Sequence, residues 1–370
     1  MVLKKFKKIG LVFDNKELWN QYRFKKLKIK NNYFKKKKYR TFSYINPNNY
    51  LKNLDLASDL NFLRKLEIYG KQKNFIFDFA KSHLQNFDYY IFFTLNNLND
   101  SQKKILFCNK KKFLYLAEPS NVDKNIRSKE YHKYFDKIFF NDLTFVDNIK
   151  YFYLNGNHVL LKENKFIYKR KKLFLYCMFA FNKNFLGSES LYYKRYKIIA
   201  WFNKNYPKDF HLYGKNWHLF FESNIFFKLA NKILLFANNW FDFKLNFLDK
   251  IYKGMCIDKV KTASQYKFEF CIENSSNYAR LSDRIISSFF SGTVPVYLGG
   301  GIIKKIIPQN CYILMQRFDS LEDLHEYLSK MSSQEYSNYL KNIKKFINSR
   351  KWFCLTADHN IINLLKAIRN

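Results

Sequence analysis

Residues 266–301 run through a strand, a polar loop, a helix and a glycine turn, an order that can hold a phosphate group. Ser282 is a candidate N-cap, and Asp283 and Arg284 occupy the first turn of the helix expected over 281–291. The free backbone N–H groups and the dipole of a helix start favour an anion. An arginine in that turn can add a bidentate contact to a phosphate.

Two neighbouring features extend this pattern. Gly299, Gly300 and Gly301 allow a ligand to approach the backbone closely, and Pro295 is typical of an edge strand or a strand start. Taken alone, however, an Asp-Arg pair in a first turn is also compatible with a solvated helix surface, and a glycine triplet with an ordinary turn. Spacing alone therefore leaves the phosphate site as one of two interpretations.

Short apolar runs that alternate with helical patterns predict an α/β fold with parallel sheets. The expected strands span residues 74–80, 88–93, 112–117, 136–140, 173–180, 267–273, 293–299 and 311–315, and the expected helices span 188–204, 281–291 and two segments of 320–349. Two doubly wound, Rossmann-like domains that face each other across a cleft would bind ligands at the carboxyl ends of their strands.

The charged stretch 161–172 lacks apolar periodicity and marks the expected domain boundary. We therefore predict an N-terminal, acceptor-binding domain over residues 1–165 and a C-terminal, nucleotide-sugar (donor) binding domain over 166–350. A C-terminal helix over 351–370 would pack back on the N-terminal domain.

The block 266–301 resembles the donor-binding motif of family 10 glycosyltransferases, the α-1,3-fucosyltransferases. That motif is a strand ending in Glu-Asn-Ser, a Thr-Glu-Lys helix start, Gly-Thr-Val-Pro-Val and a glycine turn. Its counterparts here are Glu273-Asn274-Ser275, Ser282-Asp283-Arg284, the run 292–296 and Gly299. The flanking segments 190–217, 253–268 and 307–328 resemble the family as well, so the likeness covers about 110–350 and is strongest over 250–345.

The resemblance implies a GT-B fold of two domains and transfer of fucose from GDP-fucose to an acceptor glycan, with inversion at the anomeric carbon. Arg195 matches an arginine that contacts the donor diphosphate, and Arg284 matches a lysine facing the same phosphates. Asn274 and Asp283 match donor-contacting positions, and Tyr278 lies in the loop between them.

Charge development supports these roles. The nucleoside diphosphate becomes more negative as the glycosidic bond breaks, so cations placed there stabilise the transition state more than the ground state. Two arginines and a helix start can do this without a metal ion. No metal or other cofactor is expected, because the six cysteines and seven histidines form no cluster with metal-ligand spacing.

Inversion needs a base that removes the proton from the attacking hydroxyl. The family supplies a carboxylate from the N-terminal domain, and its best match here is Glu118, which follows the strand expected over 112–117. Asp136 is the second candidate, although the pattern after it looks like a strand start.

The chain departs from the family motif at three positions, and these leave the donor sugar open. Asp283 is one methylene shorter than the usual glutamate, Arg284 replaces a lysine, and Arg280 stands where an aromatic residue is frequent. Transfer from another GDP-sugar, or a glycan-binding protein without catalysis, are the alternatives that follow.

The net charge of +36 has two interpretations. A positive field attracts nucleic acid, anionic lipid or phosphate-bearing substrates, whereas the shared abundance of Lys, Asn, Phe, Tyr and Ile also fits a compositional bias. A basic nucleic-acid-binding protein is thus an alternative, but it leaves the ordered motif unexplained and we disfavour it. Residues 1–50 hold 13 Lys and 2 Arg against one Asp and one Glu, which is compatible with peripheral contact with an anionic membrane. No apolar run is long enough for a signal peptide or a spanning helix, which predicts a cytoplasmic location.

Overall fold

The structure is a computed structural model, and its description covers most of the chain. The described residues are 6–12, 59–80, 83–93, 98–116, 128–140, 145–154, 173–179, 190–214, 251–256, 259–276 and 283–369, with the isolated positions 95, 217, 229–230, 233, 248 and 250. The chain divides into two compact units: unit 1 comprises Met1–Lys162 with Arg350–Asn370, and unit 2 comprises Glu163–Ser349. The expected boundary lay at 165/166.

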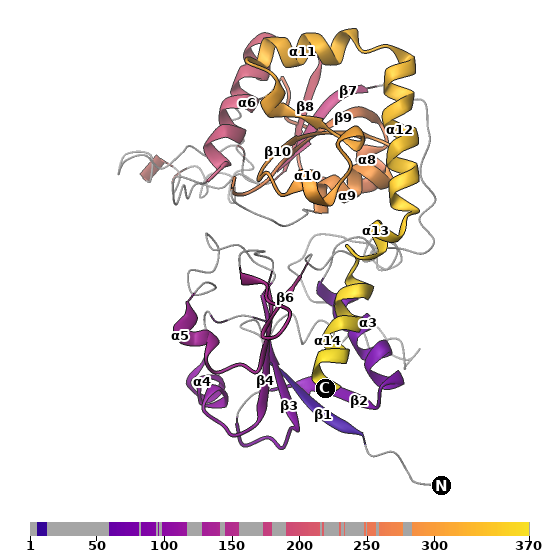
Figure 1. The fold of residues 1–370 in the computed structure, drawn as a ribbon. Coiled ribbons are helices and arrows are strands. Elements are labelled where there is room, and N and C mark those ends of the chain that lie inside the picture. Colours follow the sequence, from indigo (N-terminus) through magenta and orange to yellow (C-terminus); the bar gives the residue numbers. More distant parts are fainter. Residues whose placement is uncertain are drawn as a thin grey trace, which may run out of the picture. The chain divides into compact units, whose positions relative to one another are not determined.

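Unit 1 contains a six-stranded parallel sheet in the order β2-β1-β3-β4-β5-β6 (Figure 1). Its strands are β1 (Lys7–Val12), β2 (Phe75–Phe79), β3 (Tyr89–Phe92), β4 (Lys111–Leu116), β5 (Lys137–Phe140) and β6 (Tyr151–Tyr153). The inner strands β3, β4 and β5 are short apolar runs that are mostly buried, as parallel sheets require, whereas the edge strands β2 and β6 are partly exposed.

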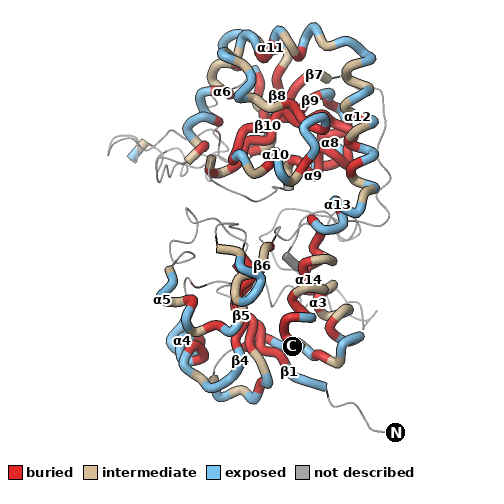
Figure 2. Tube along the Cα trace, viewed as in Figure 1, coloured by how far each residue is buried: buried red, intermediate tan, exposed pale blue. Residues whose placement is uncertain are grey.

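Helices cover both faces of this sheet. One face packs on α3 (Asp59–Gln72) and α14 (Ala357–Arg369), and the other packs on α4 (Asp100–Leu106) (Figure 2). The remaining helices of unit 1 are α5 (Lys129–His132) and α13 (Arg350–Phe353). Polar contacts reinforce the packing of the C-terminal helix, because Asp358 on α14 accepts hydrogen bonds from Lys65 Nζ at 2.5 Å and from the Tyr69 hydroxyl at 2.9 Å. The last residues of the chain thus complete the core of the first unit.

Unit 2 contains a five-stranded parallel sheet in the order β11-β10-β9-β7-β8. The strands are β7 (Leu173–Met178), β8 (Phe210–Tyr213), β9 (Tyr266–Ile272), β10 (Val294–Leu298) and β11 (Ile313–Leu314). The chain adds β8 on one side of β7 and all later strands on the other side, so the direction of winding reverses between β7 and β9. In open parallel sheets, ligands bind at the carboxyl ends of the strands that flank such a switch point.

The helices of unit 2 are α6 (Tyr192–Asn205), α8 (Lys259–Ala263), α9 (Asp283–Phe290), α10 (Ile303–Ile306), α11 (Leu321–Lys330) and α12 (Ser333–Ile347). Two short 3₁₀ turns, Gln309–Cys311 and Met315–Arg317, flank β11. Ser320 and Ser332 cap the starts of α11 and α12 by accepting hydrogen bonds from the backbone N–H groups of Asp323 and Glu335. The switch-point strands β7 and β9 are followed by α6 and α9, and these two helices carry Arg195 and Arg284.

The parallel α/β architecture expected from the sequence is confirmed, and each predicted strand is present. Three strands were absent from the set expected from the apolar pattern: β1 lies in a strongly basic segment, β6 has only three residues at the sheet edge, and β8 lies in the segment 190–217, which was placed by its resemblance to the family alone. Pro295 was expected on an edge strand or at a strand start, and the second holds, because it is the second residue of β10, which lies between β9 and β11. Its ladder with β11 begins at Val296, so the missing N–H of Pro295 falls near the strand start, before this pairing.

Among the described residues, every helix is too short or too polar to span a bilayer.

Candidate donor-binding site

The predicted arginines lie beside the switch point of unit 2. Phe179 directly follows β7, and Glu273 and Asn274 directly follow β9, so the carboxyl ends of the two strands bring these three residues together. The helices that follow the same strands, α6 and α9, carry Arg195 and Arg284. Strand order alone thus places residues from four segments at one edge of the sheet.

Arg195 is almost fully buried, with 3% of its surface exposed. Its Nη2 donates to the Ile272 carbonyl at 2.6 Å and to Asn274 Oδ1 at 2.8 Å. The Leu191 N–H, one turn earlier, donates to the Asn274 carbonyl at 3.1 Å. These contacts fasten the start of α6 to the end of β9 and explain why two residues that match the family motif, Arg195 and Asn274, lie together.

Phe179 joins the two arginines. The Arg195 guanidinium carbon lies 4.5 Å from the centre of the Phe179 ring, and the Arg284 guanidinium carbon lies 5.2 Å from the same centre. A ring that contacts two cations stabilises each of them through cation–π attraction. The sequence analysis did not single out Phe179. The one feature that could have indicated it is its place directly after a buried strand, at the edge where a ligand is expected.

The backbone around Phe179 fixes the ring in place. Trp217 Nε1 donates to the Phe179 carbonyl at 2.7 Å. Gly214 has a φ of +145°, and a β-carbon added there would lie 1.6 Å from the same carbonyl oxygen. Only glycine fits at this position, because of both the backbone conformation and the lack of space.

The two arginines lie close enough for their positive charges to repel each other. Burial, and then the positive charge of Arg284, lower the pKa of Arg195 to about 9, so the side chain stays charged at neutral pH. Within the described part of the chain, no ion pair joins Arg195 or Arg284 to a carboxylate. The buried Arg195 Nε also has no hydrogen-bond acceptor there. A bound anion would relieve the repulsion between the two guanidinium groups and could accept from this nitrogen.

Gly299 has a role other than the predicted approach to a ligand. A β-carbon added at Gly299 would lie 2.6 Å from Glu273 Cγ and 2.3 Å from the Tyr297 hydroxyl, so the space is already taken by protein atoms. At Gly301 an added β-carbon would meet no atom within 4 Å. Position 299 therefore favours glycine because the side chains of Glu273 and Tyr297 pack against it.

Several predicted residues fall outside the described structure. Glu118, the expected base, and Tyr278, in the donor loop, lie outside the described residues, as do Ser282 and Arg280. Asp283 begins α9, but its side chain is not described.

Asp136 lies at the end of its sheet opposite to the ligand edge. It precedes β5, and its Oδ2 accepts a hydrogen bond of 2.7 Å from the backbone N–H of Lys112, the second residue of β4. Ligands bind at the carboxyl ends of parallel strands, whereas Asp136 occupies the amino ends. The structure therefore rejects Asp136 as the second candidate for the base.

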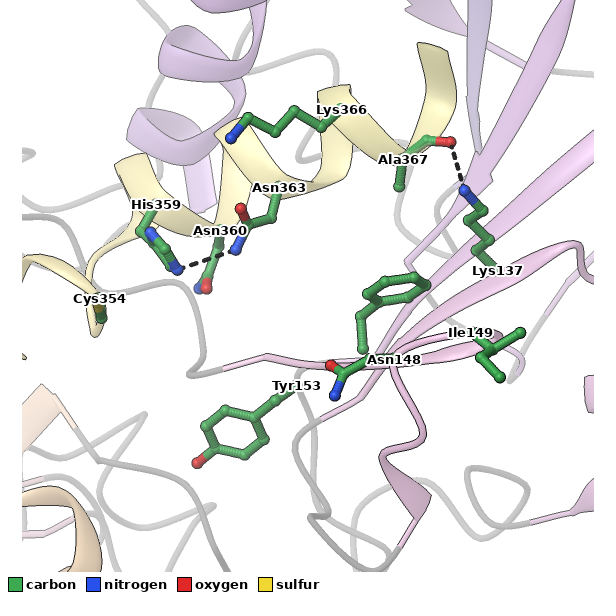
Figure 3. A pocket seen from close by; sticks show the side chains of 11 residues that line it. Lys137, Asn148, Ile149, Tyr153, Cys354, His359, Asn360, Asn363, Lys366 and Ala367 are labelled. Atoms are coloured by element: carbon green, nitrogen blue, oxygen red, sulfur yellow. Dashed lines mark hydrogen bonds between the residues drawn. The ribbon is translucent and has the colours of Figure 1, made fainter. Parts of the chain in front are cut away.

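A separate hollow of about 620 Å³ lies in unit 1, between α14 and the β5–β6 edge (Figure 3). Several of its polar groups already pair with one another: Asn363 Nδ2 lies 2.9 Å from His359 Nε2, and Lys137 Nζ donates to the Ala367 carbonyl at 3.2 Å. None of the predicted site residues lines it.

Among the described residues, no group of three or more His, Cys, Asp or Glu side chains could hold a metal ion.

Part of the chain is similar in sequence to a known protein family. Residues 250–364 match the family "Glycosyltransferase family 10 (fucosyltransferase) C-term". An α-(1,3)-fucosyltransferase of Helicobacter pylori is 27% identical over 78 residues, which are 21% of this chain and 16% of that protein. The 4-galactosyl-N-acetylglucosaminide 3-α-L-fucosyltransferase 9 of Mus musculus is 29% identical over 111 residues, which are 27% of this chain and 30% of that protein. The aligned parts thus cover only a minor share of these relatives.

Solved structures resemble the chain over a greater length. A crystal structure of an α1,3-fucosyltransferase with GDP-fucose has a TM-score of 0.53 at 14% identity, covering 100% of this chain and 92% of that chain. A crystal structure of an α1,3-fucosyltransferase gives a TM-score of 0.51 at 14% identity, covering 95% of this chain and 90% of that chain. A glycosyltransferase of Rickettsia africae gives 0.50 at 12% identity, with full coverage of both chains. At such identities these likenesses show the GT-B fold. Residues 250–364 are therefore similar to the C-terminal domain of glycosyltransferase family 10, the fucosyltransferases, in a chain built from the two parallel α/β domains of GT-B proteins.

Proposed function

We propose that this chain is an inverting glycosyltransferase that transfers fucose from GDP-fucose to a hydroxyl of an acceptor glycan. The observation that carries the proposal is the pair of guanidinium groups of Arg195 and Arg284, which lie 4.5 Å and 5.2 Å from the centre of the Phe179 ring at the switch point of unit 2. Both the family 10 match and the fold of a GDP-fucose-bound fucosyltransferase support it.

The two arginines have different parts in this mechanism. Arg195 is buried and tied to Ile272 and Asn274, so it is a fixed charge whose position does not depend on the ligand. Arg284 is partly exposed in the first turn of α9, where free N–H groups and the helix dipole also favour an anion. Preorganised positive charge stabilises the departing diphosphate more than the intact donor, because the negative charge increases during bond breakage.

Removal of the partly exposed arginine tests the site. We expect Arg284→Ala to weaken GDP binding at least about 10-fold, because a charge-assisted contact contributes about 1.5–3 kcal/mol. Isothermal titration calorimetry with GDP measures the loss. Lys197→Ala is the matched control, since Lys197 is an exposed cation on α6 that packs over the Tyr193 ring. Equal GDP affinity in Arg284→Ala and the parent protein would reject the site.

Arg195→Ala removes a buried group as well as a charge, so thermal unfolding must accompany the titration. Arg195→Lys keeps the charge but cannot reproduce the paired contacts to Ile272 and Asn274. We expect GDP affinity to decrease in both variants, with the smaller loss in Arg195→Lys.

The proposed transfer also needs a base that removes the proton from the acceptor hydroxyl. Glu118 is the carboxylate that matches the family, and Glu118→Gln should abolish transfer while GDP binding stays unchanged. Asp136→Asn is the control, because that carboxylate holds the Lys112 N–H at the opposite sheet edge. Product formation from radiolabelled GDP-fucose distinguishes them, and normal turnover in Glu118→Gln would remove Glu118 from the mechanism.

The donor sugar needs a test of its own, because Ser282-Asp283-Arg284 departs from the family motif. A thermal-shift series with GDP-fucose, other GDP-sugars, UDP-sugars and CDP-sugars identifies the donor, because a ligand that binds the folded protein raises its melting temperature. We expect the largest shift with GDP-fucose. A larger shift with another GDP-sugar would support the alternative donor, and binding without transfer would support a glycan-binding protein that lacks catalysis.

A further inference from the structure

Glu269 is a carboxyl group in the interior of unit 2 that the proposed mechanism does not use. It lies in the middle of β9, between Tyr176 of β7 and Pro295 of β10 in the sheet register, and only 1% of its surface is exposed. A buried ionised carboxylate is costly unless it is compensated. Its compensation comes from α9, the helix that carries Arg284.

Ser288 links Glu269 to the first turn of α9. The Ser288 hydroxyl is hydrogen-bonded to Glu269 Oε2 and also lies 3.0 Å from the Arg284 carbonyl oxygen. That carbonyl accepts a second side-chain hydrogen bond, from the Ser287 hydroxyl at 2.9 Å. A serine hydroxyl has one proton, so it cannot donate to Glu269 and to Arg284 at the same time.

The protonation state of Glu269 decides which of these bonds forms. An ionised Glu269 only accepts, so it takes the Ser288 proton, and of the two side-chain hydrogen bonds to the Arg284 carbonyl only the one from Ser287 remains. A neutral Glu269 can donate its own proton to Ser288 Oγ, and the Ser288 proton is then available to the Arg284 carbonyl. In the neutral form the Ser288 hydroxyl can thus bond to Glu269 and to the Arg284 carbonyl together.

The surroundings hold the two forms close to balance. Burial raises the pKa of Glu269 to about 7, while the Ser288 hydrogen bond and the charges of Arg284 on α9 and Lys259 on α8 act in the opposite direction. The other titratable groups that interact with Glu269 are Tyr176 and Cys177 of β7 and Cys271 of β9. Burial raises the pKa of all three well above their ordinary values, so they are neutral near pH 7.

We propose that Glu269 is a positioning residue for the first turn of α9, and that binding of the donor diphosphate beside Arg284 is coupled to uptake of a proton by Glu269. This inference rests on the proposed donor site. A bound diphosphate offsets the positive charge of Arg284, which is one of the two cations that favour the ionised carboxylate. Donor binding thus favours the neutral form, and by reciprocity the neutral form favours donor binding.

The sign of the pH dependence follows directly. Donor affinity rises as the pH falls through the pKa of Glu269, and it becomes constant once the carboxyl is neutral in the free protein. GDP-fucose is the suitable probe, because both of its phosphates are esterified and neither titrates near neutral pH. Free GDP has a terminal phosphate that does titrate and would obscure the result.

Calorimetric titration with GDP-fucose at pH 7, in buffers of different ionisation enthalpy, counts the protons taken up on binding. We expect a fractional uptake in the parent protein and a several-fold tighter affinity at pH 6 than at pH 8. In Glu269→Gln the amide can donate to Ser288 as the neutral acid does, so the uptake should vanish. Its affinity at pH 8 should match that of the parent protein at pH 6. Glu326→Gln is the matched control, since it removes an exposed carboxylate of α11 that pairs with Lys330, and it should keep the full uptake.

The outcomes separate this inference from the proposed function. GDP-fucose binding without proton uptake, or with equal uptake in the parent protein and Glu269→Gln, overturns the role of Glu269 and leaves the donor site intact. Absence of GDP-fucose binding in the parent protein overturns both. If Glu269→Gln is less stable, thermal unfolding with and without GDP-fucose still reports binding, and Ser288→Ala gives a second test. Ser288→Ala removes a hydrogen bond that favours the ionised carboxylate, so the pH range over which donor affinity changes should move to higher pH.

Discussion

Phe179 and Gly299 show how single residues build the site without belonging to the reaction. Phe179 contacts both guanidinium groups, and Gly299 leaves room for the buried Glu273. The motif comparison identified Arg195, Asn274 and Arg284 because their side chains match a family pattern. Phe179 was missed because a phenylalanine after a strand, in a chain with 41 of them, carries no distinguishing signal.

The glycine triplet allows a matched pair of substitutions. Gly299→Ala should destabilise unit 2 by about 1–3 kcal/mol, because the new methyl group would overlap Glu273 and Tyr297. Gly301→Ala should leave the free energy of unfolding nearly unchanged, since nothing lies within 4 Å of the added carbon. Denaturant unfolding of the two variants measures the difference, and equal stability would mean that the Glu273–Gly299 contact is absent in solution.

Glu269 predicts how stability depends on pH. Its folded pKa of about 7 lies above that of an unfolded glutamate, so its favourable contribution is complete below about pH 4.5 and is lost as the pH rises through 7. The loss amounts to on the order of 3 kcal/mol. Glu269→Gln should remove it, so the variant should show a flatter dependence of the melting temperature between pH 5 and pH 8. Parallel curves for the two proteins would contradict the assignment.

At the scale of elements, strand order determines where the site lies. Periodicity located the strands that contain long apolar runs, such as β7 and β9, because their burial on both faces requires such runs. It did not locate β1, whose first residues are basic and exposed, or the three-residue edge strand β6. The order of the strands, and with it the switch point, depends on contacts between distant segments that no local pattern encodes.

The C-terminal helix offers a test of how the elements divide between the units. Leu364 on α14 is fully buried among residues of the unit 1 core. Leu364→Ala should destabilise unit 1 by about 2–5 kcal/mol through lost burial and an unfilled cavity. We expect calorimetry to show a lower melting temperature for unit 1, while GDP still stabilises unit 2. A loss of GDP stabilisation in this variant would contradict the division.

At the scale of the whole molecule, a C-terminal region that matches the family 10 model lies in a chain with a strongly positive net charge of +36. A general positive field attracts many anions, whereas the two arginines beside Phe179 define a particular position for one. The nucleic-acid alternative explains the charge but not that geometry. A steeply salt-dependent affinity for RNA that GDP does not compete with would be its signature.

The most direct test of the account is a crystal structure of the protein soaked with GDP. We predict electron density for the diphosphate at the carboxyl ends of β7 and β9, within hydrogen-bonding distance of Arg195 and Arg284, at the start of α9. Density for GDP at any other place, or an empty site at saturating GDP, would contradict the central claim.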